Sequence, residues 1–205
     1  MIGPMLDALE SVLFDFHGTL SSGHYFRTLG AETKARISQL LFGIHSDDWV
    51  DPWMAGELDS VGICHLLAEH LGLKVSVLQD ALYDGCAHMA FNPSVLGMAR
   101  ECRARGLLIG LVTVNMDVFS EVVVPAHGLA ELFHAIINSA DFGSLDKELL
   151  WDAAFDALGA TQGYAGSLVI EDSLANVERF RALGGMAYHY ASDDALDAWR
   201  ATSGV

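Results

Sequence analysis

The sequence predicts an α/β fold in which helices cover both faces of a parallel β-sheet, with an all-helical region inserted after the first strand. Three observations lead to this prediction. Short apolar runs that end at polar residues alternate along the chain with segments of helical periodicity. These runs are continuously apolar, as is typical of strands buried on both faces of a parallel sheet. Residues 21–91 break the alternation, because they show helical spacing and no convincing strand pattern.

The first strand and the helical insert are predicted from the N-terminal half. Residues 11–14 begin a short apolar run that stops at Asp15, and a turn-prone Gly-Thr pair follows. This pattern indicates a buried strand that leads into a polar loop. Within the insert, apolar residues recur every three or four positions at 31–42 and 61–71. An all-helical insert at this point indicates a lid over the carboxyl edge of the sheet.

The remaining elements alternate, and two of the helices are followed by a glycine, Gly106 and Gly159, as helices commonly are. We therefore expect residues 1–20 and 92–205 to form an α/β core domain and residues 21–91 to form a small helical cap domain. The predicted strands lie at 107–112, 135–137, 167–170 and 186–190, and the predicted helices lie at 94–105, 118–127, 146–158 and 174–183.

The composition fits one or two globular domains and excludes several classes of protein. The chain has 205 residues, 52% of them hydrophobic, and a mean hydropathy of +0.32, so it can bury a substantial core. Disordered, collagen-like and disulfide-stapled proteins are thereby excluded. Lysines and arginines number 11 against 27 acidic residues, which gives a net charge of −16. Because such a chain repels phosphate backbones, we expect no nucleic-acid partner.

Cysteine usage and the apolar runs predict the compartment. Cys64, Cys86 and Cys102 are odd in number and have no CxxC spacing, which is typical of thiols in a reducing compartment and argues against a zinc site. No run approaches the roughly 18 apolar residues of a membrane span, and the N-terminus lacks the basic region of a signal peptide. We expect a cytoplasmic protein with no membrane partner. The sequence does not indicate the oligomeric state.

Polar residues at the predicted strand ends form a candidate site. Ligands of an open parallel sheet bind outside the carboxyl ends of its strands. Three carboxylates expected there repel one another by about 4 kcal/mol per close pair at intermediate dielectric. A divalent cation would relieve this repulsion, and a set of oxygen ligands suits Mg²⁺. The residues expected at this edge are Asp15, His17, Thr113, Glu171 and Asp172, together with Lys147 at the start of a helix.

Four short motifs occur in order along the chain. The first is Asp15-Phe16-His17-Gly18-Thr19-Leu20 after an apolar strand, and the second is Leu111-Val112-Thr113 with Asn115 close behind. The third is Lys147, and the fourth is the pair Glu171-Asp172 before a predicted helix. Together and in this order, they resemble the motifs of the haloacid dehalogenase-like (HAD) hydrolase superfamily. The resemblance covers nearly the whole chain and implies a Rossmann-like core with the cap of subfamily I, inserted between the first two motifs.

The resemblance implies a Mg²⁺-dependent phosphatase that acts on a small phosphorylated metabolite. Asp15 would attack phosphorus and form an aspartyl-phosphate, which divides one hard step into two. Thr113 would donate a hydrogen bond to the phosphoryl oxygens, and Lys147 would neutralise them together with Asp15. The ligands of Mg²⁺ would be Asp15, the backbone carbonyl of His17, Asp172 and Glu171, the last directly or through water. The substrate-binding residues would be Thr113, Asn115, Lys147, His24 and Arg27.

His17 departs from the usual pattern of the family's phosphatases, which have a second aspartate at this position as the acid and base of the reaction. In one interpretation the imidazole takes over this work, because it can protonate the leaving oxygen and later deprotonate water. In the other interpretation His17 only fills the position and contributes its backbone carbonyl to the metal site. The sequence leaves both interpretations open.

Two other functions also stay open on the sequence. A 2-haloacid dehalogenase-like hydrolase would use the aspartate on carbon without a metal, but the paired acids Glu171 and Asp172 argue against it. A weakly active binding or regulatory homologue would keep the fold and the metal site after losing the acid at position 17. Phosphate release with Mg²⁺, halide release without metal, and binding of a phosphate mimic without turnover would discriminate among the three.

Overall fold

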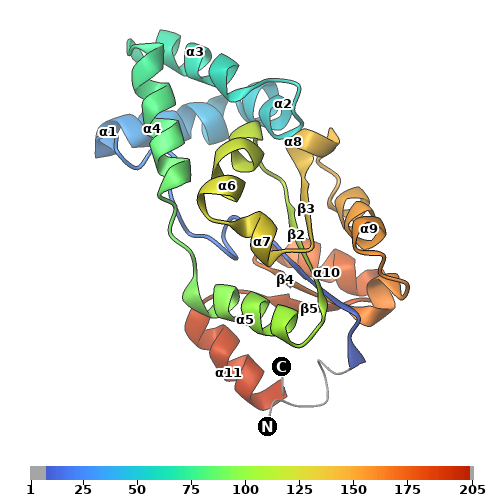
Figure 1. The fold of residues 1–205 in the computed structure, drawn as a ribbon. Coiled ribbons are helices and arrows are strands. Elements are labelled where there is room, and N and C mark those ends of the chain that lie inside the picture. The colour runs from blue at the N-terminus through green and yellow to red at the C-terminus, as the bar shows by residue number, and fades with distance from the viewer. Residues whose placement is uncertain (1–7, 204–205) are drawn as a thin grey trace.

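A five-stranded parallel sheet forms the centre of the fold in the computed structural model, which describes residues 8–203 (Figure 1). The strands are β1 (Ser11–Phe14), β2 (Leu108–Thr113), β3 (Ala135–Asn138), β4 (Ser167–Glu171) and β5 (Met186–His189). Their order in the sheet is β3-β2-β1-β4-β5, and every neighbouring pair is parallel. Strand β1 therefore lies in the middle and is hydrogen-bonded on both sides. The predicted parallel α/β architecture is confirmed.

Alternate residues of the strands point into two separate apolar cores. On β1, Val12 and Phe14 belong to the larger core, whereas Leu13 packs with Trp151 and Phe180 in the smaller one. Successive side chains of a strand point to opposite faces, so a strand between two helical layers needs apolar residues at consecutive positions. This requirement explains why the strands stand out in the sequence as continuous apolar runs.

Helices cover both faces of the sheet. They are α5 (Pro93–Ala104), α6 (Val124–Ala126), α7 (Leu129–Leu132), α8 (Ser139–Phe142), α9 (Lys147–Leu158), α10 (Leu174–Ala182) and α11 (Asp193–Ser203). Helix α9 packs on β2 and β3, α10 on β4 and β5, and α5 on β2, with α11 packed against α5. A 3₁₀ turn, η5 (Gly163–Gly166), precedes β4. Among the described residues, no helix is long and apolar enough to cross a membrane.

The predicted helix at 118–127 is irregular in the structure. Residues Phe119–Val123 form a π-helical segment, η4, and only the three residues of α6 continue as an α-helix. Pro125 has no N–H group, so the carbonyl of Glu121 has no α-helical donor and the regular ladder is broken there. The helices α7, α8 and α11 were not predicted, since α7 and α8 are one turn long and α11 is mostly polar.

The helical insert, residues 21–91, contains no strand of the sheet, and apart from isolated bridges at Ser21 and Phe91 its elements are helical. The predicted helix at 61–71 agrees with α3 within one residue. The predicted helix at 31–42 is α-helical only as far as Ser38, after which it continues as a π-helix. The elements are α1 (Ala31–Ser38), the π-helical η2 (Gln39–Ile44) and η3 (Ser46–Val50), α2 (Asp51–Met54), α3 (Ser60–Leu71) and α4 (Val75–Ala87).

The chain enters and leaves the helical insert at one place, next to the end of β1. The backbone N–H of Asn92 donates to the Leu20 carbonyl at 2.9 Å, and the Ser21 hydroxyl donates to the Ala90 carbonyl at 2.7 Å. Helix α8, which follows β3 directly, contacts α2 of the insert. The insert therefore lies beyond the carboxyl ends of the strands (Figure 1).

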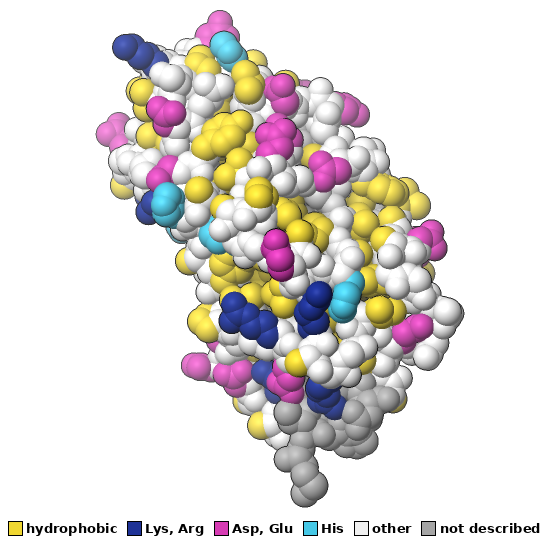
Figure 2. All heavy atoms as spheres, viewed as in Figure 1, with side chains coloured by type: hydrophobic (Ala, Val, Ile, Leu, Met, Phe, Trp, Pro, Cys, Tyr) yellow, Lys and Arg dark blue, Asp and Glu magenta, His cyan; other side chains and the backbone are white. Residues whose placement is uncertain are grey.

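The charged residues are unevenly distributed over the surface. In the view of Figure 2, acidic side chains are scattered over the molecule, several of them on the helical insert, whereas Lys and Arg side chains gather mainly near α5. Helix α5 carries Arg100 and Arg103, and Arg105 follows it directly. The excess of acidic residues is therefore spread across this face and is not concentrated in one strip.

Candidate active site

Asp15 follows the central strand β1 and lies between the carboxyl ends of its two neighbours. Its backbone N–H donates to the Ile170 carbonyl of β4 at 3.0 Å, so strand pairing fixes the backbone up to this residue. The side chain is only 6% exposed. Asp15 thus lies at the edge where an open parallel sheet presents its ligand site.

Lys147, the first residue of α9, holds the Asp15 carboxylate. Its Nζ donates to Asp15 Oδ1 at 2.5 Å and to the Val112 carbonyl at 2.9 Å, and it lies 3.4 Å from Glu171 Oε2. The ammonium group is buried, and burial by itself would lower its pKa. The two neighbouring carboxylates outweigh burial and raise the pKa of Lys147, so the side chain is charged at neutral pH.

Two acidic residues at the end of β4 form a cluster with Asp15. Carboxylate oxygens of Asp15, Glu171 and Asp172 all lie within 4.8 Å of one another. Glu171 is 2% exposed, and its Oε1 accepts a hydrogen bond from the Ser173 N–H at 3.1 Å. Asp172 is exposed, and its Oδ1 accepts from the Thr19 hydroxyl at 3.2 Å. The first and fourth motifs, far apart in the sequence, therefore meet at one edge of the sheet.

The acidic cluster carries more negative charge than Lys147 balances. Burial raises the pKa of Glu171 to about 7, and the charge of Asp15 adds to this effect. Burial also raises the pKa of Asp15, against the opposing influence of Lys147. Within the described part of the chain, the buried Glu171 Oε2 accepts no hydrogen bond. Closely spaced hard oxygen ligands with surplus negative charge fit a Mg²⁺ ion.

The loop after Asp15 approaches Asp172 closely because it contains a glycine. Gly18 has a φ of +89°, where residues with a side chain are strained, and a Cβ atom there would lie 2.2 Å from Asp172 Oδ2. Glycine therefore lets the loop backbone pass beside this carboxylate. His17, whose backbone carbonyl the family resemblance assigns to the metal, belongs to the same loop.

Strand β2 places Thr113 and Asn115 at the same edge. Thr113 is the last residue of β2, is 1% exposed, and follows the carbonyl that binds Lys147. Asn115 is equally buried, and its Oδ1 accepts from the Tyr25 hydroxyl at 2.9 Å and from the Met116 N–H at 3.0 Å. Its Nδ2 has no hydrogen-bond partner among the described residues. Asn115 thus keeps a free donor at the site.

The three other predicted site residues are His17, His24 and Arg27. His17 is exposed, and its ring lies beside that of Tyr25 with centroids 5.8 Å apart and planes inclined by 27°. Desolvation lowers the pKa of the His17 imidazole. His24 lines a cavity together with His17. Arg27, in contrast, forms an ion pair with Asp84 Oδ2 of α4 at 2.9 Å and is not among the residues that line this cavity.

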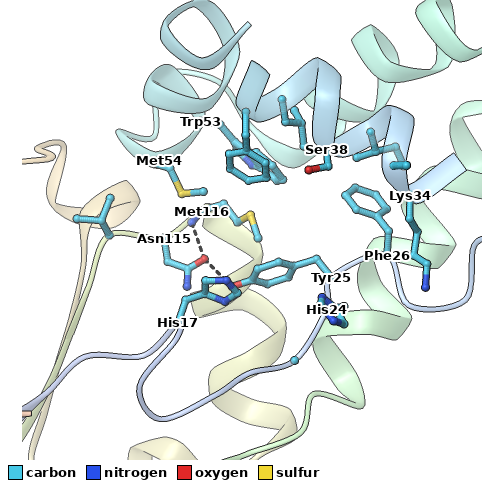
Figure 3. A pocket seen from close by; sticks show the side chains of 16 residues that line it. His17, His24, Tyr25, Phe26, Lys34, Ser38, Trp53, Met54, Asn115 and Met116 are labelled. Carbon is cyan, nitrogen blue, oxygen red and sulfur yellow. Dashed lines mark hydrogen bonds between the residues drawn. The ribbon is translucent and has the colours of Figure 1, made fainter. Parts of the chain in front are cut away.

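This cavity has a volume of about 530 Å³ and lies between the core and helix α1 of the insert (Figure 3). On the core side it is bounded by His17 and Asn115, and on the side of the insert by Trp53 and Met54. Tyr25, Trp53, Met54 and Met116 were not predicted as site residues. Aromatic and methionine residues are as common in any apolar core, so no sequence signal distinguishes those that line a cavity.

Asp117 links the insert to the core and was also missed. Its Oδ1 accepts hydrogen bonds from the Trp53 indole N–H at 3.0 Å and from the Ser60 hydroxyl, and its Oδ2 accepts from the Ser60 N–H at 2.9 Å. A second link runs from the Ser139 hydroxyl to the Met54 carbonyl at 2.6 Å. The bonds of Asp117 fix α2 and the start of α3 against the segment after β2, and the bond of Ser139 fixes α2 against α8. In the sequence, Asp117 is only one more acidic residue near a strand end.

The fold is similar to those of several solved proteins. A HAD-family enzyme from Bacteroides thetaiotaomicron, solved in complex with magnesium and inorganic phosphate, is 14% identical, with a TM-score of 0.69 over 90% of this chain and 95% of that one. A predicted HAD-like family hydrolase from Porphyromonas gingivalis is 16% identical, with a TM-score of 0.62 over 88% and 90% of the two chains. A dehalogenase is 15% identical, with a TM-score of 0.65 over 88% and 84%.

The comparisons at the level of sequence gave a different result. No protein-family model matches the sequence, and no curated protein matches it. At 14–16% identity, the structural similarity establishes a shared fold. The resemblance inferred from the four motifs is therefore confirmed at the level of the fold.

Proposed function

We propose that this chain, which has the fold of the HAD-family enzymes, is a Mg²⁺-dependent hydrolase that releases phosphate from a small phosphorylated molecule through Asp15. The observation that carries the proposal is the acidic cluster of the buried Asp15 and Glu171 with the exposed Asp172, whose carboxylate oxygens lie within 4.8 Å of one another, with Lys147 Nζ bound to Asp15. The similar enzyme from B. thetaiotaomicron, solved with magnesium and inorganic phosphate, supports it.

The metal would be held by residues of the two neighbouring strand ends. Its ligands would be the carboxylates of Asp15 and Asp172 and the backbone carbonyl of His17, with Glu171 bound directly or through water. When bound, Mg²⁺ supplies positive charge that neutralises the phosphoryl oxygens. Lys147 Nζ lies 3.4 Å from the buried Glu171 Oε2 and also binds Asp15, so one ammonium is shared by two carboxylates. This sharing supports a second cation at this place.

The reaction would proceed in two displacement steps at phosphorus. A carboxylate oxygen of Asp15 attacks phosphorus, a new P–O bond forms, and the bond from phosphorus to the ester oxygen breaks while His17 gives its proton to that oxygen. His17 then takes a proton from a water molecule, whose oxygen attacks phosphorus and releases inorganic phosphate and free Asp15. Both steps need the groups to be held in line with phosphorus, which a site on rigid strand ends favours.

Two further residues would position the phosphoryl group. Lys147 binds Asp15 Oδ1, which leaves the other carboxylate oxygen for the attack, and its charge balances that of the transferring group. Thr113 would donate its hydroxyl hydrogen to a phosphoryl oxygen.

We also propose that residues 21–91 act as a cap domain over the core formed by residues 1–20 and 92–205. A cytoplasmic location is supported by the three cysteines, which are all free and buried.

An aryl phosphate assay tests the proposed function. Phosphate release should require Mg²⁺, stop on addition of a chelator, and fall at least about 10³-fold in Asp15→Asn, because removing a nucleophile costs that much or more. The matched control is Asp156→Asn, which changes an exposed aspartate on α9 and should retain full activity. Full activity in a folded Asp15→Asn variant would disprove the mechanism. Halide release from a 2-haloacid in the presence of chelator would instead indicate chemistry on carbon.

A further inference from the structure

The cavity between the core and helix α1 is lined mainly by apolar side chains. Its volume of about 530 Å³ lies in the range of small-molecule sites, roughly 300–1,000 Å³. None of the described residues that line it is acidic, although the insert carries several exposed acidic residues. Six apolar side chains carry the argument, and they are Phe26, Ile37, Leu41, Trp53, Met54 and Met116.

One polar group on the core side of the cavity has no partner in the described part of the chain. Asn115 is 1% exposed, and its Nδ2 makes no hydrogen bond. The orientation of the amide is fixed, because the Met116 N–H can only donate and therefore requires Oδ1 as its acceptor. Figure 3 shows the amide nitrogen directed toward the side of His17 and away from the apolar wall. A buried donor without a partner is costly, so this position is suited to an acceptor oxygen of a ligand.

The walls of the cavity on the side of the insert are held in place. Trp53 is 2% exposed, and its indole N–H donates to both the Ser60 hydroxyl and Asp117 Oδ1 at 3.0 Å. With its polar atom bound elsewhere, the ring presents apolar surface to the cavity. Met54 follows Trp53 in the chain, and both Met54 and Met116 line the same cavity (Figure 3). The polar side chains Lys34 and Ser38 of α1 and His24 also line the cavity, whereas the wall formed by Trp53, Met54 and Met116 offers no side-chain hydrogen-bonding group other than the indole N–H that Asp117 and Ser60 already bind.

We propose that the organic group of the substrate is apolar, so that the site takes phosphate monoesters of hydrophobic alcohols or phenols. The inference rests on the proposed function and adds the substrate class to it. The phosphoryl end lies near Asp15, the Asn115 amide donates to an oxygen of the ester group, and the hydrocarbon part fills the space bounded by Trp53, Met54 and Met116. His17, two residues after Asp15, lines the cavity, whereas the three carboxylates of the acidic cluster do not.

A series of n-alkyl phosphates tests this substrate class. Each methylene buried from water contributes up to about a fourfold gain in kcat/KM, so kcat/KM should rise at least ~20-fold from ethyl to hexyl phosphate. Glycerol phosphate should be at least about tenfold poorer than propyl phosphate, because its two hydroxyl groups would lose their hydrogen bonds to water against the apolar wall of Trp53, Met54 and Met116. A flat series, or a preference for the hydroxylated ester, would overturn the proposal.

Binding measurements separate this inference from the proposed function. Alkyl phosphonates cannot be hydrolysed at the P–C bond by this route. Calorimetry with Mg²⁺ therefore measures how their affinity depends on the length of the alkyl group, without any contribution from hydrolysis. Tighter binding with increasing chain length, without hydrolysis of any alkyl phosphate, would support the apolar cavity and reject the phosphatase. Hydrolysis of the alkyl phosphates, combined with phosphonate affinities that do not depend on the length of the alkyl group, would support the phosphatase and reject the apolar substrate class.

A volume-matched variant locates the hydrocarbon chain. Met54→Gln keeps the size of a partly buried side chain and places an amide in the cavity wall, so it should reduce the gain from ethyl to hexyl at least about fivefold. The control Met186→Gln makes the same change at a partly buried position of β5 outside the cavity, and the gain should be unaffected. An equal rise in kcat/KM from ethyl to hexyl phosphate in both variants and in the unmodified protein would show that the alkyl group binds elsewhere.

Discussion

Lys147 is one of three lysines in a chain that carries 27 acidic residues. Its position as the first residue of α9 follows from Asp146, whose side chain accepts the Glu148 N–H and caps the helix. The buried ammonium contacts the carboxylates of Asp15 and Glu171. One ammonium cannot balance three ionised carboxylates, and in the proposed function a bound Mg²⁺ would supply the remaining charge that a phosphoryl group meets.

At the same scale, the side chain of His17 is predicted to assist the reaction as acid and base. His17→Asn keeps the backbone carbonyl but removes a titratable group, so kcat should fall about 10²-fold or more, which is the usual contribution of general acid–base catalysis. Steady-state assays with an aryl phosphate and saturating Mg²⁺ measure the effect. His17→Asp, which installs the usual residue of the family's phosphatases, should retain or exceed the original kcat. An unchanged kcat in His17→Asn would mean that the side chain only fills the position.

Glu171 should destabilise the folded protein when no metal is bound, and its carboxylate should contribute to metal binding. Its carboxylate is 2% exposed and lies close to that of Asp15, so Glu171→Gln should raise stability in chelator by about 1 kcal/mol. At a Mg²⁺ concentration of 100 Kd, the free energy of unfolding of the original protein should rise by about 2.7 kcal/mol. At the same Mg²⁺ concentration it should rise by less in Glu171→Gln. Thermal unfolding with and without Mg²⁺ measures both effects. Glu178→Gln, an exposed change on α10, is the control, and an equal gain in both variants would remove Glu171 from the metal site.

At the scale of elements, the contact between α2, α3 and the loop after β2 depends on one carboxylate. Asp117→Ala would leave the buried Ser60 N–H without its acceptor and should cost about 1–3 kcal/mol of stability. Because Asp117 also binds the Trp53 indole, KM for a hydrophobic phosphate should rise in the same variant while that for ethyl phosphate changes little. Urea unfolding and steady-state kinetics measure the two effects. Asp156→Ala is the control, and a loss below about 0.5 kcal/mol would show that the link is dispensable.

At the scale of the whole molecule, the net charge of −16 should destabilise the folded chain by self-repulsion. Raising NaCl from 10 to 100 mM shortens the screening length from about 30 to about 10 Å and should raise Tm by roughly 2–4 °C, equivalent to about 1 kcal/mol. Unfolding scans in chelator measure the effect without metal binding. A lower Tm at the higher salt concentration would mean that local ion pairs, such as Arg179 with Glu148, outweigh the general repulsion.

The parallel α/β architecture, and the edge of the sheet at which the candidate site lies, could both be predicted from the amino-acid sequence. Strands between two helical layers must be continuously apolar, and polar residues at their ends, such as Asp15 and Thr113, mark the carboxyl edge. These are local properties of the chain, so a pattern reveals them. The short helices and the π-helical segments were missed because they extend over too few residues to show a period.

The surroundings of the site could not be predicted, because they depend on contacts between distant parts of the chain. The Tyr25 hydroxyl meets Asn115 across 90 positions of sequence, and Trp53 meets Asp117 across 64. Arg27, expected to contact substrate, pairs with Asp84 of α4. Such contacts depend on how the insert packs against the core, and no periodicity or spacing within one segment encodes that packing. A cavity wall has the same residue types as a core, so composition cannot distinguish the two, whereas the arrangement of the folded chain does.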